Sequence, residues 1–269
     1  MGFNRYVFFL SLLVFSGCDL IDYHPYDTNL DSDTETNINE KNIEKIYSIC
    51  EGKDTIRFAF MGDTQRAYDE TERFMKHLNK RNDIDFVIHG GDLADFGMKK
   101  EFEWLHGILS KLTAPYVALI GNHDIIGNGS RVYRKMYGDD NFSFLAGKIK
   151  FVCLNTNAIE YDYSKPVPDF VFIRNELIDS VNHYEKTIVV MHAPPFNEQF
   201  NNNVAEVFHE YIKRFPSLQF CLHAHTHSVS VNNFFNDGVW YYGCANMEKR
   251  GYLLFTMYPD HYDYEVIFF

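Results

Sequence analysis

Five short clusters of polar residues punctuate this chain, and each directly follows an apolar run with the length of a β-strand. The apolar runs cover residues 56–61, 86–89, 116–120, 187–191 and 218–222. The clusters are Asp63-Thr64-Gln65, Gly91-Asp92-Leu93-Ala94-Asp95, Gly121-Asn122-His123-Asp124, His192-Ala193-Pro194-Pro195 and His223-Ala224-His225-Thr226-His227. Because the loops at the carboxyl ends of strands converge in α/β sheets, the clusters are predicted to meet at one edge.

Helical patterns separate these runs along most of the chain. Helices are expected near residues 69–81, 99–112, 169–183 and 204–215, and a hairpin is expected around Gly147. After residue 228 only strand patterns follow, with a turn at Asn236-Asp237-Gly238. This order predicts a layered α/β domain in which sheets pack together beneath flanking helices.

The clusters supply carboxylates, an amide and imidazoles, the side chains that hold divalent metals. Each cluster alone could be only a turn or a strand end. Their recurrence after successive strands favours a metal site. His89 and His223 are expected to have structural or supporting roles beside it. The other histidines outside the clusters, His77, His106, His183, His209 and His261, are expected at the surface.

The five clusters together resemble the motifs of the calcineurin-like metallophosphoesterase superfamily, over nearly all of residues 56–269. That family has an Asp-x-His motif, then Gly-Asp-x-x-Asp, Gly-Asn-His-Asp/Glu, a lone His and Gly-His-x-His. Two departures stand out: Gln65 replaces a histidine and Ala224 replaces a glycine. The resemblance implies a four-layer α/β/β/α sandwich with mixed sheets and a metal site at the carboxyl ends of strands.

The resemblance also implies two divalent ions, drawn from Mn, Fe, Zn and Mg, and assigns ligands to them. The first ion would be held by Asp63, Gln65, Asp92 and His227, and the second by Asp92, Asn122, His192 and His225, with Asp92 as the bridge. In such sites a hydroxide between the metals attacks phosphorus. His123 would assist the leaving group, Asp95 would orient its ring, and Asn122, His123 and Arg66 would contact the substrate.

Gln65 and Arg66 are the two open assignments. A neutral amide oxygen binds metals more weakly than imidazole does, so Gln65 either completes a weaker first site or only forms hydrogen bonds nearby. Arg66 either reaches a substrate phosphate or remains a solvated or ion-paired side chain.

The N-terminus predicts export. Residues 6–15 form an apolar stretch after Arg5 that is too short to span a bilayer, and Ser16-Gly17-Cys18 follows it. This pattern resembles the bacterial lipobox and implies a signal peptide over 1–17. A lipidated Cys18 would then anchor the protein in the cell envelope. The alternatives are an ordinary cleaved signal or a buried strand.

Residues 18–54 are expected to form an acidic tether and lead-in, followed by a single domain over 55–269. Ten acidic residues and three lysines occupy 19–54. The formal net charge is −12 and the folded part also remains acidic, so no nucleic-acid partner is expected. Disulfides among Cys50, Cys153, Cys221 and Cys244 are permitted by export, although Cys153 and Cys221 are expected as buried thiols.

The sequence therefore predicts a membrane-tethered hydrolase of a small phosphoester. One alternative is a phosphodiesterase acting on a nucleotide, a nucleotide sugar or a lipid head group. Another, from a different class, is a non-catalytic binding scaffold of the same fold.

Overall fold

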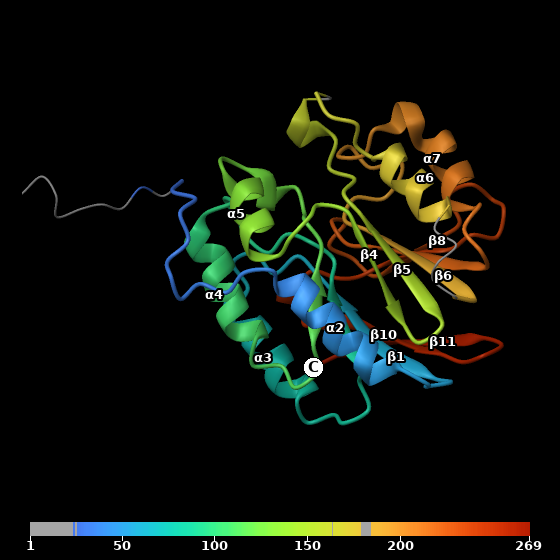
Figure 1. Cartoon of the computed structure of the whole chain (residues 1–269), viewed down its shortest axis with the longest axis horizontal. Coiled ribbons are helices and arrows are strands. Elements are labelled where there is room, and N and C mark those ends of the chain that lie inside the picture. The colour runs from blue at the N-terminus through green and yellow to red at the C-terminus, as the bar shows by residue number, and fades with distance from the viewer. Residues whose placement is uncertain (1–23, 25, 163, 179–183) are drawn as a thin grey trace, which may run out of the picture.

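The computed structural model describes residues 24, 26–162, 164–178 and 184–269 (Figure 1). The signal peptide and Cys18 lie outside the described residues. The helices are α2 (Ile38–Cys50), α3 (Tyr68–Leu78), α4 (Lys99–Leu109), α5 (Gly129–Met136), α6 (Phe170–Ile178) and α7 (Ala205–Ile212). Short 3₁₀ turns cover His123–Ile125, Ile159–Tyr161, Asn202–Val204 and Met247–Lys249. Among the described residues, no helix is both long and apolar enough to cross a bilayer.

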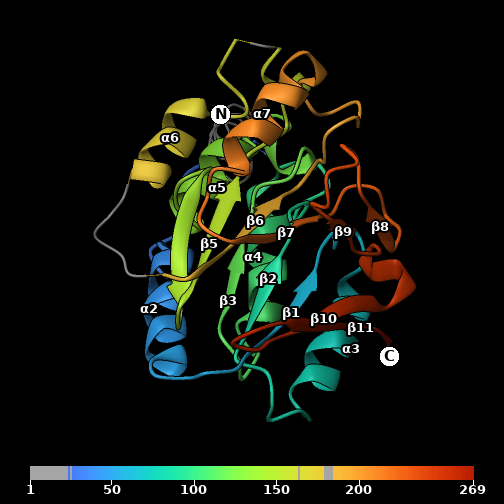
Figure 2. The ribbon, with the colours of Figure 1, turned by 90° about the vertical axis from the view of Figure 1, so that its right-hand side faces the viewer.

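The strands form two mixed sheets, which confirms the predicted sandwich. The first has the order β11-β10-β1-β2-β3 and the second the order β4-β5-β6-β7-β9-β8. The strand bounds are β1 (Ile56–Met61), β2 (Phe86–His89), β3 (Tyr116–Ala118), β4 (Phe142–Ala146), β5 (Ile149–Leu154), β6 (Lys186–Met191), β7 (Leu218–His223), β8 (Ser230–Asn232), β9 (Tyr241–Gly243), β10 (Gly251–Met257) and β11 (Tyr262–Phe268). Figure 2 shows β1, β2 and β3 side by side, with α2 at the β3 edge.

Three buried apolar clusters hold the layers together. Phe58, Phe151 and Phe220 belong to the cluster that fills the space between the two sheets. A second cluster packs α3, α4 and α5 on the outer face of the first sheet, and a third packs α6 and α7 on the outer face of the second. The parallel strands β1, β2 and β3, and β5, β6, β7 and β9, are buried on both faces, as their continuous apolar runs predict.

Helix α2 belongs to the fold, although its sequence lies in the acidic lead-in. Ile46 and Cys50 are fully buried between the sheets. The Asn39 side chain donates to the carbonyl oxygen of Ala118 and accepts from its N–H, both at 2.9 Å, so it pairs with edge strand β3 as a strand would. Ordered structure thus begins well before residue 55. The predicted boundary at residue 54 therefore falls after a helix that packs into the fold. The acidic tether stays a prediction only for the residues before α2.

All four described cysteines are buried and free. Burial raises the pKa of the Cys50 thiol to about 12. The expectation of buried thiols at Cys153 and Cys221 is confirmed, and Cys50 and Cys244 join them.

Candidate metal centre

Asp92 lies at the centre of the converging loops, directly after β2. Its carboxylate belongs to two groups of potential metal ligands, one with His192 and His225 and the other with Asp63 and His227. Within each group the ligand atoms lie within 4.8 Å of one another. A carboxylate with two oxygens can serve two cations, so the shared position of Asp92 suits a bridge.

The backbone at this centre is held in an unusual conformation. Asp63, Asp92, His225 and His227 have φ values of 51°, 60°, 62° and 55°. Non-glycine residues rarely occupy this left-handed region, and such strain concentrates at functional sites where the surrounding structure enforces it. These four residues follow β1, β2 and β7, and their side chains converge in the two ligand groups.

Glycine is required where two of these loops touch. A Cβ on Gly121 would lie 2.1 Å from the backbone nitrogen of Asp92 and 2.2 Å from its Oδ1. A Cβ on Gly91, whose φ is 103°, would lie 2.7 Å from Nδ1 of His192. Side chains at these positions would push the bridging carboxylate and an imidazole out of place, which explains the glycines of the second and third clusters.

The atoms of the second ligand group, which contains Asp92, His192 and His225, lie close together around Asn122. The Oδ1 atom of Asn122 lies 3.0 Å from both Nε2 of His192 and Nδ1 of His225, and these two nitrogens are 3.2 Å apart. His192 donates from Nδ1 to the carbonyl oxygen of Gly90 at 2.9 Å, so its Nε2 is the atom left for a metal. An amide oxygen and two imidazole nitrogens that face one another are a donor set for a divalent cation.

The first ligand group contains Asp63, His227 and Gln65 around the same Asp92. Nε2 of His227 lies 3.4 Å from Oδ1 of Asp63. Gln65 donates from Nε2 to Oδ2 of Asp92 at 3.1 Å, while its buried Oε1 has no hydrogen-bond partner among the described residues. A buried amide oxygen without a partner fits a metal ligand. This group is more open than the other, because the His227 side chain is 45% exposed.

The negative charges of the buried carboxylates also favour a bound cation. Burial lowers the pKa of His192, but the adjacent Asp92 carboxylate outweighs it and raises the pKa to about 9. A hydrogen bond with Asp63 similarly raises the pKa of His227. Two buried carboxylates thus favour positive charge on their imidazole neighbours, and divalent metals would supply it. The residues present therefore fit a metal centre.

His123, Asp95 and Arg66 lie together at the edge of this centre. Nδ1 of His123 donates to the main-chain carbonyl oxygen of Asp95 at 2.9 Å, and the Asp95 carboxylate is further away, at 3.7 Å. That carboxylate accepts from Nε of Arg66 at 2.5 Å. Asp95 thus contacts the His123 ring mainly through its backbone. Arg66 is ion-paired, although its side chain remains 67% exposed at the mouth of the site.

Two supporting residues complete the loops. The buried carboxylate of Asp124 accepts from the backbone N–H groups of Asp92, Ala94 and Gly121 at 3.0, 2.7 and 2.8 Å. Sequence reasoning gave Asp124 no role, although its place directly after His123 was a usable signal. His89 contacts Thr64 at 2.9 Å and accepts from the N–H of Gly91, as expected for a supporting residue.

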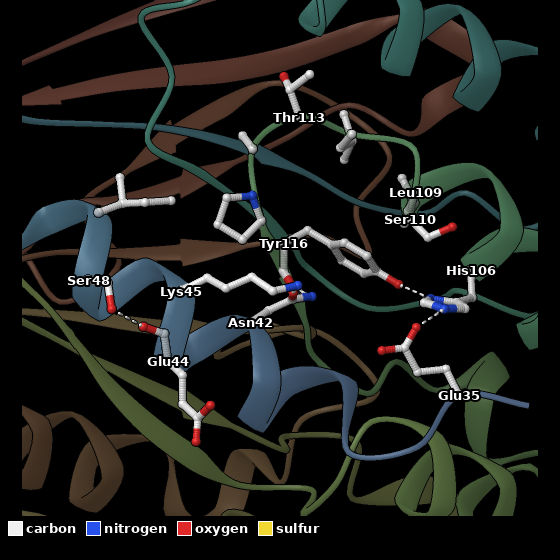
Figure 3. Close-up of a pocket in the computed structure, with 14 residues that line it drawn as sticks. Glu35, Asn42, Glu44, Lys45, Ser48, His106, Leu109, Ser110, Thr113 and Tyr116 are labelled. Atoms are coloured by element: carbon white, nitrogen blue, oxygen red, sulfur yellow. Dashed lines mark hydrogen bonds and ion pairs between the residues drawn. The ribbon is translucent and has the colours of Figure 1, made fainter.

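A cavity of about 580 Å³ lies away from the metal centre, beside α2 and α4 (Figure 3). Its polar side chains contact one another: His106 bridges the Tyr116 hydroxyl and Glu35, and Asn42 donates to the Tyr116 carbonyl oxygen. This cavity contains none of the predicted site residues.

A two-sheet sandwich with two groups of potential metal ligands that share one carboxylate is typical of metallohydrolases. The family model of the calcineurin-like phosphoesterases matches residues 56–229. The chain belongs to this family.

Relatives and solved structures agree with this assignment. A 3',5'-cyclic-nucleotide phosphodiesterase of Nostoc sp. (strain PCC 7120) is 26% identical over 71% of this chain and 80% of its own length. An uncharacterized protein of Bacillus subtilis is 33% identical over 34% of this chain, which spans only 8% of that protein. A dimetal phosphatase from Danio rerio shares the fold, with a TM-score of 0.63, 11% identity and coverage of 78% of this chain and 95% of that one.

Proposed function

We propose that this protein is a metal-dependent phosphodiesterase whose favoured substrates are 3',5'-cyclic nucleotides. The observation that carries the metal-dependent activity is the Asp92 carboxylate, which belongs to both ligand groups. The substrate class rests on the similarity to the cyclic-nucleotide phosphodiesterase of Nostoc. The broader alternatives are phosphomonoesters, nucleotide sugars and lipid head groups.

Two divalent ions would be held by the two ligand groups, with Asn122 completing the second and Gln65 the first. When bound, such ions supply an activated water and neutralise charge on the phosphoryl oxygens. The available oxygen and nitrogen donors suit Mn, Fe, Zn or Mg. The protein holds these donors in place before binding, because Asp63 accepts from the backbone N–H of His225 and the loops are joined at Asp92.

His123 would assist departure of the leaving group. Its Nδ1 is committed to the Asp95 carbonyl oxygen, so Nε2 is the atom that can hold a proton for the substrate. As water adds to phosphorus and the ester P–O bond breaks, that proton passes from Nε2 to the leaving oxygen, which becomes a hydroxyl of the ring-opened nucleotide. The partial exposure of the His123 side chain, 35%, allows a substrate to reach it. Arg66, ion-paired with Asp95 and 67% exposed, would help to position the phosphate.

The experiment compares hydrolysis of 3',5'-cyclic AMP, bis(p-nitrophenyl) phosphate and p-nitrophenyl phosphate by protein reconstituted with Mn²⁺. Faster turnover of the two diesters than of the monoester supports the proposal. A monoester preference would favour a phosphatase. No metal-stimulated hydrolysis of any of these compounds would favour the binding scaffold.

We further propose that the chain is exported and tethered to a membrane through lipid at Cys18. The support is the apolar stretch and the Ser16-Gly17-Cys18 sequence. Metabolic labelling with a fatty-acid analogue tests this. Label on the native protein and none on Cys18→Ser is expected, and equal labelling of both would refute the tether.

A further inference from the structure

A second pocket, of about 290 Å³, lies beside the metal-binding loops at the carboxyl ends of β6 and β7. Its lining includes Pro194, two residues after His192, and Thr226, which lies between His225 and His227 in the sequence. Its volume is at the lower end of the range for small-molecule sites. The pocket is thus lined by residues next in sequence to candidate ligands of both groups.

Three polar atoms of this pocket are buried without a partner. These are Nε2 of His223 and the hydroxyl oxygens of Thr226 and Ser230, and none has a hydrogen-bond partner among the described residues. His223 is 0% exposed. A buried polar group without a partner costs free energy, so three around one pocket point to a ligand that pairs with them.

The strand register explains how the pocket forms. Gly243 of β9 pairs with His223 on one side and with Ser230 on the other, so the three residues share one face of the sheet. A Cβ on Gly243 would lie 2.5 Å from both the His223 ring and the Ser230 hydroxyl. The absence of a side chain at Gly243 therefore leaves room for the His223 and Ser230 side chains to lie above it.

The hydrogen-bonding pattern specifies the ligand. His223 Nδ1 lies 3.0 Å from the carbonyl oxygen of Ala224 and donates to it, which leaves Nε2 as an acceptor. The hydroxyls of Thr226 and Ser230 can donate. The pocket thus suits a group that presents an N–H donor beside an acceptor, as the amino-bearing edge of adenine does. Purine, with a hydrogen in place of the amino group, keeps the ring-nitrogen acceptors but has no such donor.

Aromatic rings supply the surface for a flat base. Phe196 is 53% exposed and Phe234 lies 6.0 Å from it, centroid to centroid. Phe196 has a φ of 68°, an uncommon conformation for a bulky residue, and its backbone N–H donates to Asn202 at 2.7 Å. An exposed ring held in a strained conformation at a pocket mouth is suited to stacking on a base.

We infer that this pocket binds the nucleobase of the substrate and selects an amino-bearing base such as adenine. The inference rests on the proposed phosphodiesterase function and gives that site its substrate specificity. The metal-binding loops would hold the phosphate while the base pairs with His223, Thr226 and Ser230.

The test measures kcat/KM of the Mn²⁺-loaded protein for 3',5'-cyclic AMP and for the 3',5'-cyclic phosphate of purine riboside, which lacks the amino group. A site built to bond an N–H discriminates strongly against an analogue that lacks it, so we expect a preference of about tenfold or more for cyclic AMP. Ser230→Ala and His223→Leu are expected to reduce the ratio to about threefold or less. If His223→Leu fails to fold, the effect of Ser230→Ala on the ratio is sufficient for the test.

Ser228→Ala is the matched control, because the Ser228 hydroxyl already donates to the carbonyl oxygen of Thr226 at 3.2 Å. It should leave the ratio at the wild-type value. A wild-type ratio near one, or a ratio that Ser230→Ala does not change, would overturn the inference and leave these groups a structural role only. Turnover of bis(p-nitrophenyl) phosphate distinguishes this from failure of the proposed function, in which no diester is cleaved.

Discussion

The carboxylate of Asp124 accepts a hydrogen bond from the backbone N–H of Asp92 at 3.0 Å, so a residue outside both ligand groups holds the backbone of the residue that they share. The same oxygen accepts from Gly121, and the other accepts from Ala94. One buried side chain thus joins the loops after β2 and β3.

Asp124→Asn is expected to weaken metal binding without removing a ligand. The amide can offer only one oxygen, so its NH₂ group must face at least one backbone N–H, at a cost of about 1–3 kcal/mol. Metal content after dialysis, measured by elemental analysis, should fall together with the free energy of unfolding. Full metal content in a folded variant would contradict this role.

Gln65→Ala is expected to lower the affinity of the first metal site and leave the second site filled. The reason is the loss of a buried amide oxygen beside Asp92. Titration calorimetry with Mn²⁺ should show one weakened binding step. Gln199→Ala is the control, because Gln199 also has a buried Oε1 without a described partner but lies outside both ligand groups. Unchanged titrations for both variants would end the ligand assignment.

His123→Asn is expected to slow hydrolysis of alkyl phosphodiesters by roughly 10²–10⁴-fold, the usual range for loss of a general acid. Esters with an acidic nitrophenol leaving group should be affected much less, because they need little protonation. Steady-state kinetics on both substrate types, with metal content as the control, tests this role. Equal losses on both types would instead indicate a positioning function.

Gly62→Ala should destabilise the fold by about 1–3 kcal/mol, the usual cost of overpacking a core. The new methyl group would lie 3.0 Å from the Cβ of Ala224, which is fully buried. Adding Ala224→Gly conserves the total volume and should restore most of the loss. Urea denaturation of the wild type, both single variants and the double variant gives the free energies of unfolding for a double-mutant cycle. Additive changes in these free energies would show that the two positions do not share this space.

His89 should make the protein less stable in acid. Burial lowers its pKa to about 3, while the unfolded chain has the ordinary value near 6.5. Below pH 6.5 the unfolded state therefore binds one more proton, and stability falls by up to about 1.4 kcal/mol per pH unit as pH decreases. Urea denaturation of metal-free protein between pH 7.5 and 5 measures the slope. His89→Gln should reduce it, and equal slopes would refute the assignment.

The fold was largely predictable because strand-like runs, helical periodicity and turn residues agree with one another from residue 56 onward. Helix α2 was missed as part of the core because its charges suggest a tether, and only the two sheets make places for Ile46 and Cys50. His209 was wrongly expected at the surface. It is 1% exposed and contacts the Tyr241 hydroxyl and Asp237, partners that lie about 30 residues away in the sequence.

The candidate ligands could be named from their order along the chain, and the structure brings them together around Asp92, while their binding of metal stays a prediction. The supporting contacts could not be predicted. The fit of Ala224 against Gly62 and Gly90, and the pairing of Gly243 with His223 and Ser230, depend on strand register, which a single sequence does not determine.

The Asn39 side chain also covers part of the exposed edge of the first sheet. A bare sheet edge exposes amides that another chain can pair with, and self-association by strand addition begins there. Asn39 already occupies the N–H and the carbonyl oxygen of Ala118, so edge strand β3 cannot template such growth at that residue. A protein shortened to begin at residue 55 would lose this protection, and we expect its first defect to be aggregation.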